Sequence, residues 1–196
     1  MKMAKKFLAV ALAGVLALSV LTGCANSVKS KDVADSLTKM GIKVEQSKDV
    51  DKTAKSTLTA IEAIINSETN TGAAAANKIT LENAVEKTNG KVIKSTGVVT
   101  AADTANAVKK ALGIDTNMAN VGKQVRVALV EIKNAKKDAS LQAALVKDAL
   151  VEAQAATVAN TTTHKVAETG KLGTATTKDG KYILVVIVND VVAKNA

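Results

Sequence analysis

The hydrophobic and polar positions in the first half of the chain predict short amphipathic helices. Over 32–40 the apolar residues recur at i, i+4 and i+7, and Gly41 follows as a natural residue to end the helix. The same spacing recurs over 51–66, where Ser47 or Asp49 is placed to cap the first turn. We therefore expect two helices, each with one buried face.

The pattern then becomes less regular. The polar and alanine-rich stretch 67–77 is predicted to be a loop, and 80–88 a third helix that ends at Asn89-Gly90. The stretch 91–100 is rich in β-branched residues and is predicted to be a strand. Thr100 to Asp103 has the form of a capping box, so a further helix is expected up to Gly113.

The middle of the chain fits two interpretations. In 124–133 some apolar residues alternate as in a strand, whereas Val125, Leu129 and Ile132 fit one face of a helix. No turn dipeptide separates this run from the next, so we prefer a helix. The stretch 138–159 is rich in alanine and leucine and is predicted to be the longest helix.

The C-terminal end has the pattern of a β-hairpin. Two β-type runs flank Lys178-Asp179-Gly180, and Asp-Gly is a strong turn signal. The apolar run 182–188 does not alternate, which predicts a strand covered on both faces at the centre of a sheet. Such a sheet needs another strand, for which 91–99 is the candidate. The expected fold is α+β, with mostly helical N-terminal and middle segments packed on a small antiparallel sheet that includes the C-terminal hairpin.

The first 24 residues have the layout of an export signal. Three lysines in the first six residues precede an uncharged apolar run, 7–22, which is short for a membrane span, and Leu21-Thr22-Gly23-Cys24 follows. This ending resembles the lipobox of bacterial lipoproteins. The resemblance implies that Cys24, the only cysteine in the chain, receives a diacylglycerol thioether and becomes the first residue of a palmitate-bearing protein. The alternatives are an uncleaved signal anchor and a buried Cys24.

The lipobox sets the expected boundaries and location. Residues 1–23 are predicted to be the lipoprotein signal peptide, 24–31 a short lipid-anchored tether and 32–196 a single exported α+β domain. Two acyl chains give stable attachment. We expect the protein on the outer face of the cell membrane, or on the outer membrane if the source has two membranes, since residue 25 is Ala and not Asp.

Charge and aromatic content narrow the classes of partner. Removing the signal removes three lysines and no acids, so the net charge falls from +9 to +6. The basic residues are dispersed among acids, which fits a solvated surface or attraction to anionic wall polymers or lipid head groups. Tyr182 is the only aromatic ring outside the signal apart from His164, so base-stacking nucleic-acid sites and sugar platforms are not expected.

The sequence offers little for catalysis. His164 is the only histidine, with no cysteine or second histidine near it, so we expect no metal site and no cofactor. No Gly-x-Ser-x-Gly or phosphate-binding glycine motif occurs. We expect no catalytic residues and no enzymatic activity, and we interpret His164 as a polar residue in a loop.

Two stretches of the second half, the alanine-rich 125–164 that leads to His164 and the β-type 170–188, have a pattern in common with a known family. They resemble the opening helix pair and the closing hairpin of the CAP superfamily of cysteine-rich-secretory and pathogenesis-related proteins. The segment between them that carries a second histidine, an acid and a tryptophan in the family is missing. The resemblance therefore implies no metal-binding cleft, and only His164 carries over.

The leading functional hypothesis is a non-catalytic binding or structural module at the cell envelope. It would be held at the membrane through lipidated Cys24 and would contact anionic wall polymer, lipid head groups or an envelope protein. The alternatives are a small solute-binding lipoprotein, a degenerate CAP-like domain protein and an enzyme acting on wall or peptide.

Overall fold

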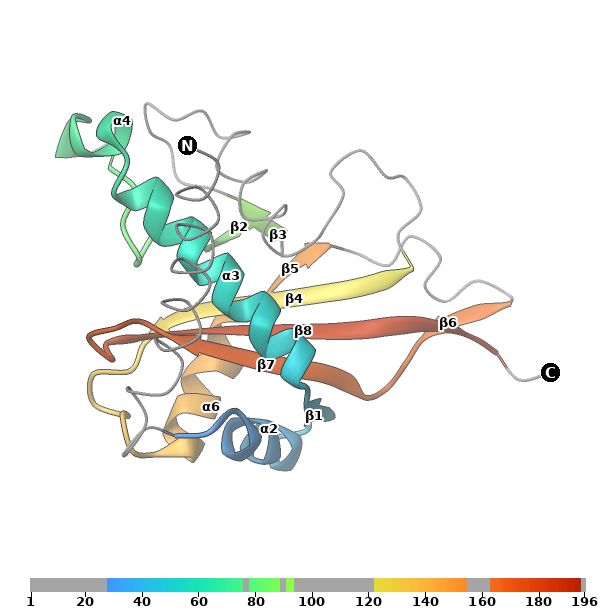
Figure 1. Cartoon of the computed structure of the whole chain (residues 1–196). Helices are drawn as coiled ribbons and strands as arrows, with labels where there is room; N and C mark the ends of the chain where they lie inside the picture. The colour runs from blue at the N-terminus through green and yellow to red at the C-terminus, as the bar shows by residue number, and fades with distance from the viewer. Residues whose placement is uncertain (1–27, 76–77, 89–90, 94–121, 155–162, 195–196) are drawn as a thin grey trace, which may run out of the picture.

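The computed structural model describes residues 28–75, 78–88, 91–93, 122–154 and 163–194 (Figure 1). The elements follow in the order α2 (Ser30–Lys39), β1 (Val44–Gln46), α3 (Lys48–Ile65), α4 (Glu68–Thr71), β2 (Glu86–Thr88), β3 (Lys91–Ile93), β4 (Lys123–Glu131), α6 (Ala139–Ala149), β5 (Val151–Gln154), β6 (His164–Val166), β7 (Gly170–Thr176) and β8 (Tyr182–Ala193). Helices and strands of similar extent make an α+β fold, as the sequence predicts.

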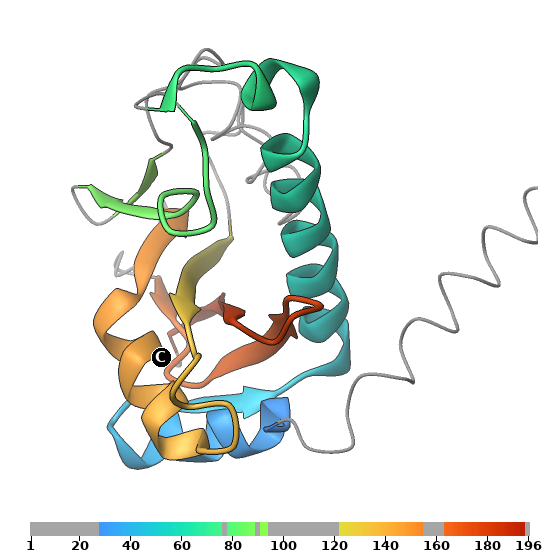
Figure 2. The ribbon, with the colours of Figure 1, turned by 90° about the vertical axis from the view of Figure 1, so that its left-hand side faces the viewer.

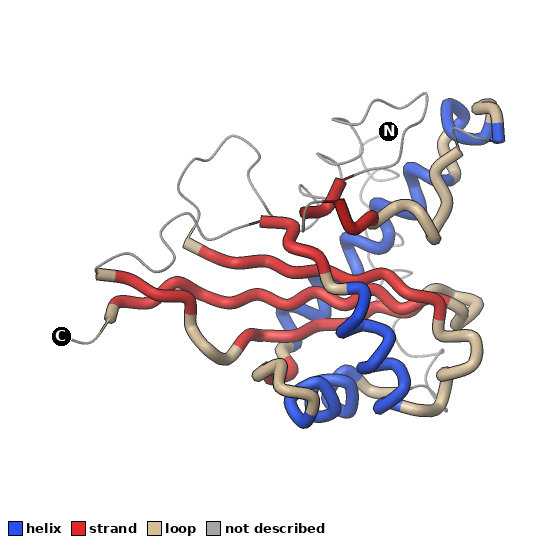
Figure 3. Tube along the Cα trace, turned by 180° about the vertical axis from the view of Figure 1, so that it is seen from behind, coloured by secondary structure: helices blue, strands red, loops and turns tan. Residues whose placement is uncertain are grey.

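The strands form one eight-stranded sheet in the order β1-β7-β8-β4-β5-β3-β2, and β6 pairs with the far end of β8. Its centre, β7-β8-β4-β5, is antiparallel, whereas β1 runs parallel to β7 and β3 parallel to β5. The sheet is thus larger than the small antiparallel sheet expected from sequence, and it is mixed. Figure 3 shows the long strands lying side by side.

The C-terminal hairpin is confirmed at the centre of this sheet. Gly180 in its turn has φ +67°, the left-handed conformation that glycine adopts readily. β8 lies between β7 and β4, and its residues from Ile183 to Ile187 are at most 2% exposed. Both faces of this apolar run are covered, which explains why it does not alternate.

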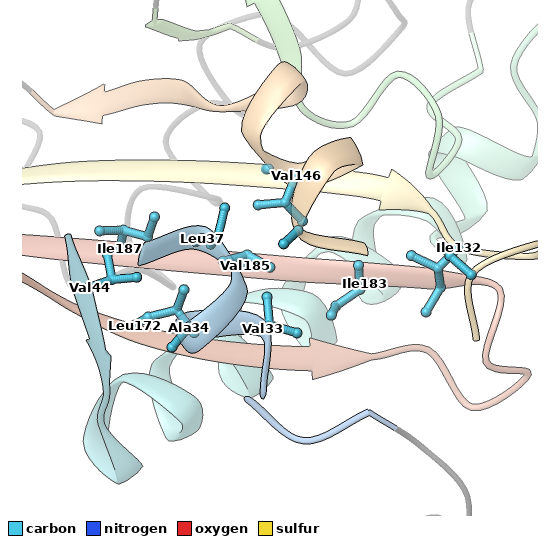
Figure 4. Close-up of a cluster of buried hydrophobic side chains, with 13 residues drawn as sticks. Val33, Ala34, Leu37, Val44, Ile132, Val146, Leu172, Ile183, Val185 and Ile187 are labelled. Carbon is cyan, nitrogen blue, oxygen red and sulfur yellow. The ribbon is translucent and has the colours of Figure 1, made fainter. Parts of the chain in front are cut away.

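Helices cover the two faces of the sheet separately, as Figure 2 shows. α3 lies on one face, where Ala54, Leu58 and Ile61 pack against Val127, Val151, Leu184 and Val186. α2 and α6 lie on the other face, where Figure 4 shows Val33, Leu37 and Val146 over Ile183, Val185 and Ile187. Because strand side chains alternate in direction, neighbouring residues of β8 serve the two different cores.

The first two helices match the sequence prediction closely. α2 is followed by Gly41 with φ +89°, and the Asp32 side chain accepts a hydrogen bond from the Lys29 backbone N–H at 3.3 Å. Ser47 occupies the N-cap position of α3, although its side chain makes no capping bond. The predicted loop 67–77 contains a short helix, α4, whose first turn is capped by the Ser67 hydroxyl.

Asp51, in the first turn of α3, joins three other elements of the fold. Its Oδ1 accepts hydrogen bonds from the Ser30 hydroxyl at 2.8 Å and from the Thr174 backbone N–H at 2.9 Å. Its Oδ2 accepts from the Gln46 side-chain amide at 2.5 Å. β1 pairs with β7 only as far as Leu172, so the carboxylate supplies the acceptor that the β7 edge loses where β1 ends.

Three helix predictions in the middle of the chain need correction. The segment 124–133 is the long strand β4, not a helix, because it pairs along its whole length with β8. The segment 80–88 is a turn followed by strand β2, which pairs antiparallel with β3. The helix over 138–159 ends at Ala149, because the next residues form β5 and pair with β4.

The start of the predicted strand 91–99 is confirmed as β3, which pairs with β2 and β5 and not with the hairpin. Residues 94–99, the helix expected up to Gly113 and residues 1–27 lie outside the described residues. Among the residues that the structure describes, no helix is long and apolar enough to span a bilayer.

Candidate functional site

Arg126 lies near one end of β4 on the sheet face that α2 and α6 cover. Ala128, two residues further along the strand, belongs to the core beneath these helices, so Arg126 projects from the same face. In the sheet it stands between Ile187 of β8 and Glu152 of β5. Arg126 is only half-buried at this position.

A hydrogen-bonded row of polar side chains crosses the sheet here. The Arg126 Nη2 donates to Asn189 Oδ1 at 3.1 Å, and the Asn189 Nδ2 donates to the Ala167 carbonyl at 3.0 Å. Beside this row, Gln124 of β4 donates from Nε2 to Glu152 Oε2 of β5 at 3.3 Å. The row fixes one side of the guanidinium and leaves the rest of it for other contacts.

Asn189 reaches this position because of a local irregularity between β6 and β7. His164 pairs with Ala193 and Lys171 with Val188, so the β6–β7 chain carries two more residues than β8 over the same length. The extra residues bulge out beside Asn189, which is 3% exposed. At Gly170 a Cβ would lie 2.7 Å from Asn189 Oδ1, so this approach requires glycine.

An open, polar pocket of about 350 Å³ lies in front of Arg126. It is lined by Gly41, Ile42, Lys43, Arg126 and Glu168. Lys43 and Glu168 form its rim, joined by an ion pair of 2.6 Å between Nζ and Oε2. This hydrogen bond raises the pKa of Lys43 and lowers the pKa of Glu168. Both rim side chains are largely solvated, so the pair contributes little to stability.

The guanidinium in this pocket has spare hydrogen-bonding capacity. The Arg126 Nε is buried and makes no hydrogen bond within the part of the chain that the structure describes. Burial lowers the pKa of Arg126, and the charge of Glu152 opposes this effect. An arginine stays protonated at neutral pH, so the pocket is lined by a partly desolvated cation whose buried Nε–H has no acceptor among the described residues. Such a group binds carboxylate or phosphate oxygens by charge-assisted hydrogen bonds.

A second pocket, of about 390 Å³, lies at the other end of the sheet and contains Tyr182. The Tyr182 hydroxyl donates a hydrogen bond to Glu82 Oε1, which raises the pKa of Tyr182 to about 12. Nearby, the buried Asn70 side chain bonds the backbone N–H and carbonyl of Ile79 and the carbonyl of Ile65. These bonds tie the 78–85 segment to α3, so we assign this region a structural role.

The residues singled out in the sequence do not form a site together. Cys24 lies outside the described residues. His164 is an exposed residue that begins β6, not a loop residue, and its Nδ1 lies 2.9 Å from the Thr163 hydroxyl. Among the described residues, no three His, Cys, Asp or Glu side chains are grouped as metal ligands.

Arg126 was not found by sequence reasoning because 124–133 was interpreted as a helix. One signal was nevertheless present in the composition, since Arg126 is the only arginine in a chain with 26 lysines. A guanidinium differs from an ammonium in offering a planar fork of donors. A single arginine inside an apolar run was therefore a signal that could have marked Arg126 as a candidate binding residue.

The comparisons with known proteins assign no family. The chain matches no protein-family model, no curated protein sequence and no solved structure. The resemblances to bacterial lipoproteins and to the CAP superfamily stay predictions. Within 125–164, the described residues form most of β4, α6, β5 and the start of β6, in place of the helix pair that the CAP resemblance implies.

Proposed function

We propose that this protein is a lipid-anchored extracytoplasmic binding module that contacts an anionic polymer of the cell envelope through the Arg126 pocket. It is not an enzyme in this proposal. The anchor is the diacylglycerol on Cys24, and the ligand group is a phosphate or carboxylate of the polymer. The observation that carries the binding role is the half-buried guanidinium, whose Nε is unpaired within the described chain and which faces an open pocket.

The anchor is supported by the N-terminal sequence. A basic start, a short apolar run and Leu-Thr-Gly-Cys stand in the order that lipidation requires, and Cys24 is the only cysteine. Every described element lies after residue 27, so a protein that begins at Cys24 retains all of them. Mass spectrometry of the N-terminal peptide would show the lipid on Cys24, and Cys24→Ser would abolish it and release the protein from membranes.

The polymer is supported by the form of the pocket and by the charge. The pocket is open, which suits one repeating unit of a long chain better than an enclosed solute. The protein without its signal carries a net charge of +6, which attracts polyanions over the Debye length. A small carboxylate solute is the second candidate, because the guanidinium would bind it in the same way.

Co-sedimentation with purified cell-wall sacculi tests this proposal. The probe protein is the chain from Cys24 with Cys24→Ser, and the sacculi are used with and without their anionic polymers, from 0.05 to 1 M salt. We expect binding that requires the polymers and is lost at high salt, because the Debye length falls from about 10 Å at 0.1 M to about 3 Å at 1 M.

Variants of the pocket separate a specific contact from general attraction. Arg126→Gln should weaken binding at least tenfold, and Arg126→Lys should restore only part of it, because lysine lacks the bidentate fork. Lys171→Gln, an exposed lysine paired with Asp190, makes the same charge change outside the pocket and should have little effect. Equal losses for Arg126→Gln and Lys171→Gln would contradict the assigned site. Binding that persists at 1 M salt or without the polymers would contradict the polymer as ligand.

A further inference from the structure

Two turns at the end of the sheet opposite Arg126 bring five lysines together. Glu131 at the end of β4 pairs with Tyr182 at the start of β8, so the turns at 132–138 and 177–181 lie side by side. The Ile132 N–H donates to the Lys181 carbonyl at 2.6 Å, and the Lys136 Nζ donates to the Asp179 carbonyl at 3.2 Å. We call this the turn surface. Its lysines are Lys133, Lys136, Lys137, Lys178 and Lys181.

The lysines of the turn surface are exposed, whereas two of the three acids beside them are engaged in the fold. The Asp138 Oδ1 caps α6 by accepting from the Leu141 N–H at 2.9 Å. The Asp179 carboxylate accepts from the Thr177 hydroxyl and from the Lys181 backbone N–H, which lowers the pKa of Asp179. Glu131 is the third acid and is exposed. The Lys181 Nζ also pairs with Asp179 Oδ2 at 3.5 Å. With five lysines against these three acids, the surface presents an excess of positive charge to its surroundings.

An exposed apolar side chain adjoins these charges. Leu141 is 42% exposed in the first turn of α6, directly after the turn that carries three of the lysines. Leu145, one helical turn further on, is 37% exposed. Lysines beside an exposed leucine are the combination that interfacial protein surfaces use on anionic lipid, where the chain is attracted by charge and held by shallow insertion.

The chain enters the domain beside the middle of the long strands. The Ser30 hydroxyl lies 2.7 Å from the Thr174 hydroxyl, and Thr174 is three residues before the 177–181 turn. Through β8, Thr174 is in register with Ala128, three residues from Glu131 and two from Arg126. Val28 packs against the core cluster beneath α2 and α6. In Figure 1 the blue start of the described chain lies on the side of α2 that is toward the β4–α6 connection.

Covalent geometry limits how far Ser30 can be from the anchor. Six residues separate Cys24 from Ser30, and an extended chain of that length spans at most about 22 Å. The register of Thr174 adds about 10 Å, three residues, from Ser30 to the end of β4 at Glu131. Arg126 lies five residues along β4 from Glu131, which is about 17 Å further from the turns. If the turn surface faces the bilayer, the Arg126 pocket lies toward the end of the sheet that is further from it.

We propose that the turn surface rests on anionic lipid head groups of the membrane that carries the anchor, and that this contact directs the Arg126 pocket outward. The inference rests on the proposed lipid attachment at Cys24, although the lipid affinity of the surface can be tested without the anchor. The lysines supply the attraction, Leu141 supplies an apolar contact, and the short tether supplies the high local concentration of membrane.

Vesicle flotation tests the lipid affinity. The Cys24→Ser protein is mixed with vesicles of phosphatidylcholine alone, or of phosphatidylcholine with 30% phosphatidylglycerol, at about 0.05 M salt. The turn-surface variant carries Lys133→Gln, Lys137→Gln and Lys178→Gln. The matched control carries Lys48→Gln, Lys55→Gln and Lys123→Gln, three exposed lysines elsewhere with the same total change in charge.

We expect binding only to the anionic vesicles, weakened at least tenfold in the turn-surface variant and less than twofold in the control. Equal losses in the two variants would show that net charge alone is responsible and would overturn the inference. Absence of vesicle binding would overturn it as well. If the turn-surface variant instead loses binding to sacculi while Arg126→Gln retains it, the surface binds wall polymer and not lipid.

The orientation is tested in the lipidated protein. Cys24 is blocked by its thioether, so a cysteine at Lys178→Cys or at Lys165→Cys takes a single fluorophore. Spin-labelled head groups should quench the label at 178 and leave the label at 165, which lies on β6, largely unquenched. Equal quenching of the two labels in a membrane-bound protein overturns this inference alone. A protein that does not pellet with membranes contradicts the anchor of the proposed function.

Discussion

Replacing Asp51 by alanine removes the side chain that joins α3 to α2, β1 and β7. The carboxylate accepts three hydrogen bonds, from the hydroxyl of Ser30, the amide of Gln46 and the backbone N–H of Thr174. Two of these donors are side chains that water can reach after a small movement. The third is a backbone N–H at the point where β1 no longer covers the edge of β7.

The expected loss follows from these three contacts. A buried donor left without a partner costs about 1–3 kcal/mol, and a donor that is rehydrated costs about 0.5–1 kcal/mol. Asp51→Ala should therefore lower the free energy of unfolding by about 3 kcal/mol. This is a large fraction of the 5–15 kcal/mol that is typical of a domain.

Asp49→Ala is the matched control. Asp49 lies in the same first turn of α3, so both substitutions remove one carboxylate that interacts with the helix dipole. Asp49 is 89% exposed and pairs only with Lys52 at 3.0 Å, an interaction expected to contribute less than about 1 kcal/mol. Urea unfolding followed by far-ultraviolet circular dichroism measures both variants on the Cys24→Ser protein.

The difference between the two variants is the decisive quantity. We expect Asp51→Ala to be less stable than Asp49→Ala by about 2 kcal/mol or more, with similar m-values. If the two variants unfold at the same urea concentration, the Asp51 bonds do not hold these elements together, and the description of the α3–β7 contact is wrong.

Two further predictions concern other contacts of the fold. Gly173→Ala should lower the free energy of unfolding by about 3 kcal/mol or more, because a Cβ there would lie 2.1 Å from the Val50 carbonyl carbon. Gly122→Ala is the control: a Cβ at Gly122 meets open space, so this variant should be nearly neutral in the same urea assay. Tyr182 is the only tyrosine, so its absorbance at 295 nm should titrate near pH 12 in the folded protein, and Glu82→Gln should move the midpoint toward 10. Because folding raises the pKa of Tyr182, the contribution of this group to the free energy of unfolding is full below about pH 10 and is lost as the pH rises to about 12. A titration midpoint near pH 10 in the folded protein would refute the Glu82 contact.

The parts of the fold that could be predicted have strong local signals. Gly41 ends α2 and Gly180 turns the hairpin, each with the positive φ that glycine favours. The apolar run that begins β8 had no polar alternation, and the structure places it between two strands with helices on both faces. In these places the local preference and the tertiary contacts agree.

The errors lie where a distant strand decides the local structure. Residues 151–154 have the composition of a helix, but they form β5 and pair with β4, and the chain turns extended at Leu150 with ψ 128°. The apolar residues of β4 fit the spacing of a helix as well as that of a strand. Pairing with β8, some 60 residues later in the chain, decides in favour of the strand. Asn89-Gly90 was interpreted as a helix end, although it also stands between two strands that pair with each other.

The candidate site was beyond sequence reasoning for the same reason. Arg126, Asn189 and Glu168 come from three separate segments, and only the register of β4, β8 and the β6–β7 bulge brings them together. The lysines of the turn surface are likewise separated by some 40 residues in sequence and joined by the pairing of Glu131 with Tyr182. The proposed N-terminal signal is local in the sequence, so it could be proposed without any tertiary contact.

The most direct test of the central claim observes the Arg126 side chain itself. Because the chain has one arginine, a nitrogen-15 labelled protein gives a single Nε–Hε resonance in a heteronuclear correlation spectrum. We predict that this resonance shifts and saturates on titration with solubilised anionic wall polymer, and that 1 M salt reverses the shift. Two results would contradict the account: a resonance that does not shift although the polymer binds to another part of the protein, and a titration in which the polymer does not bind to the protein.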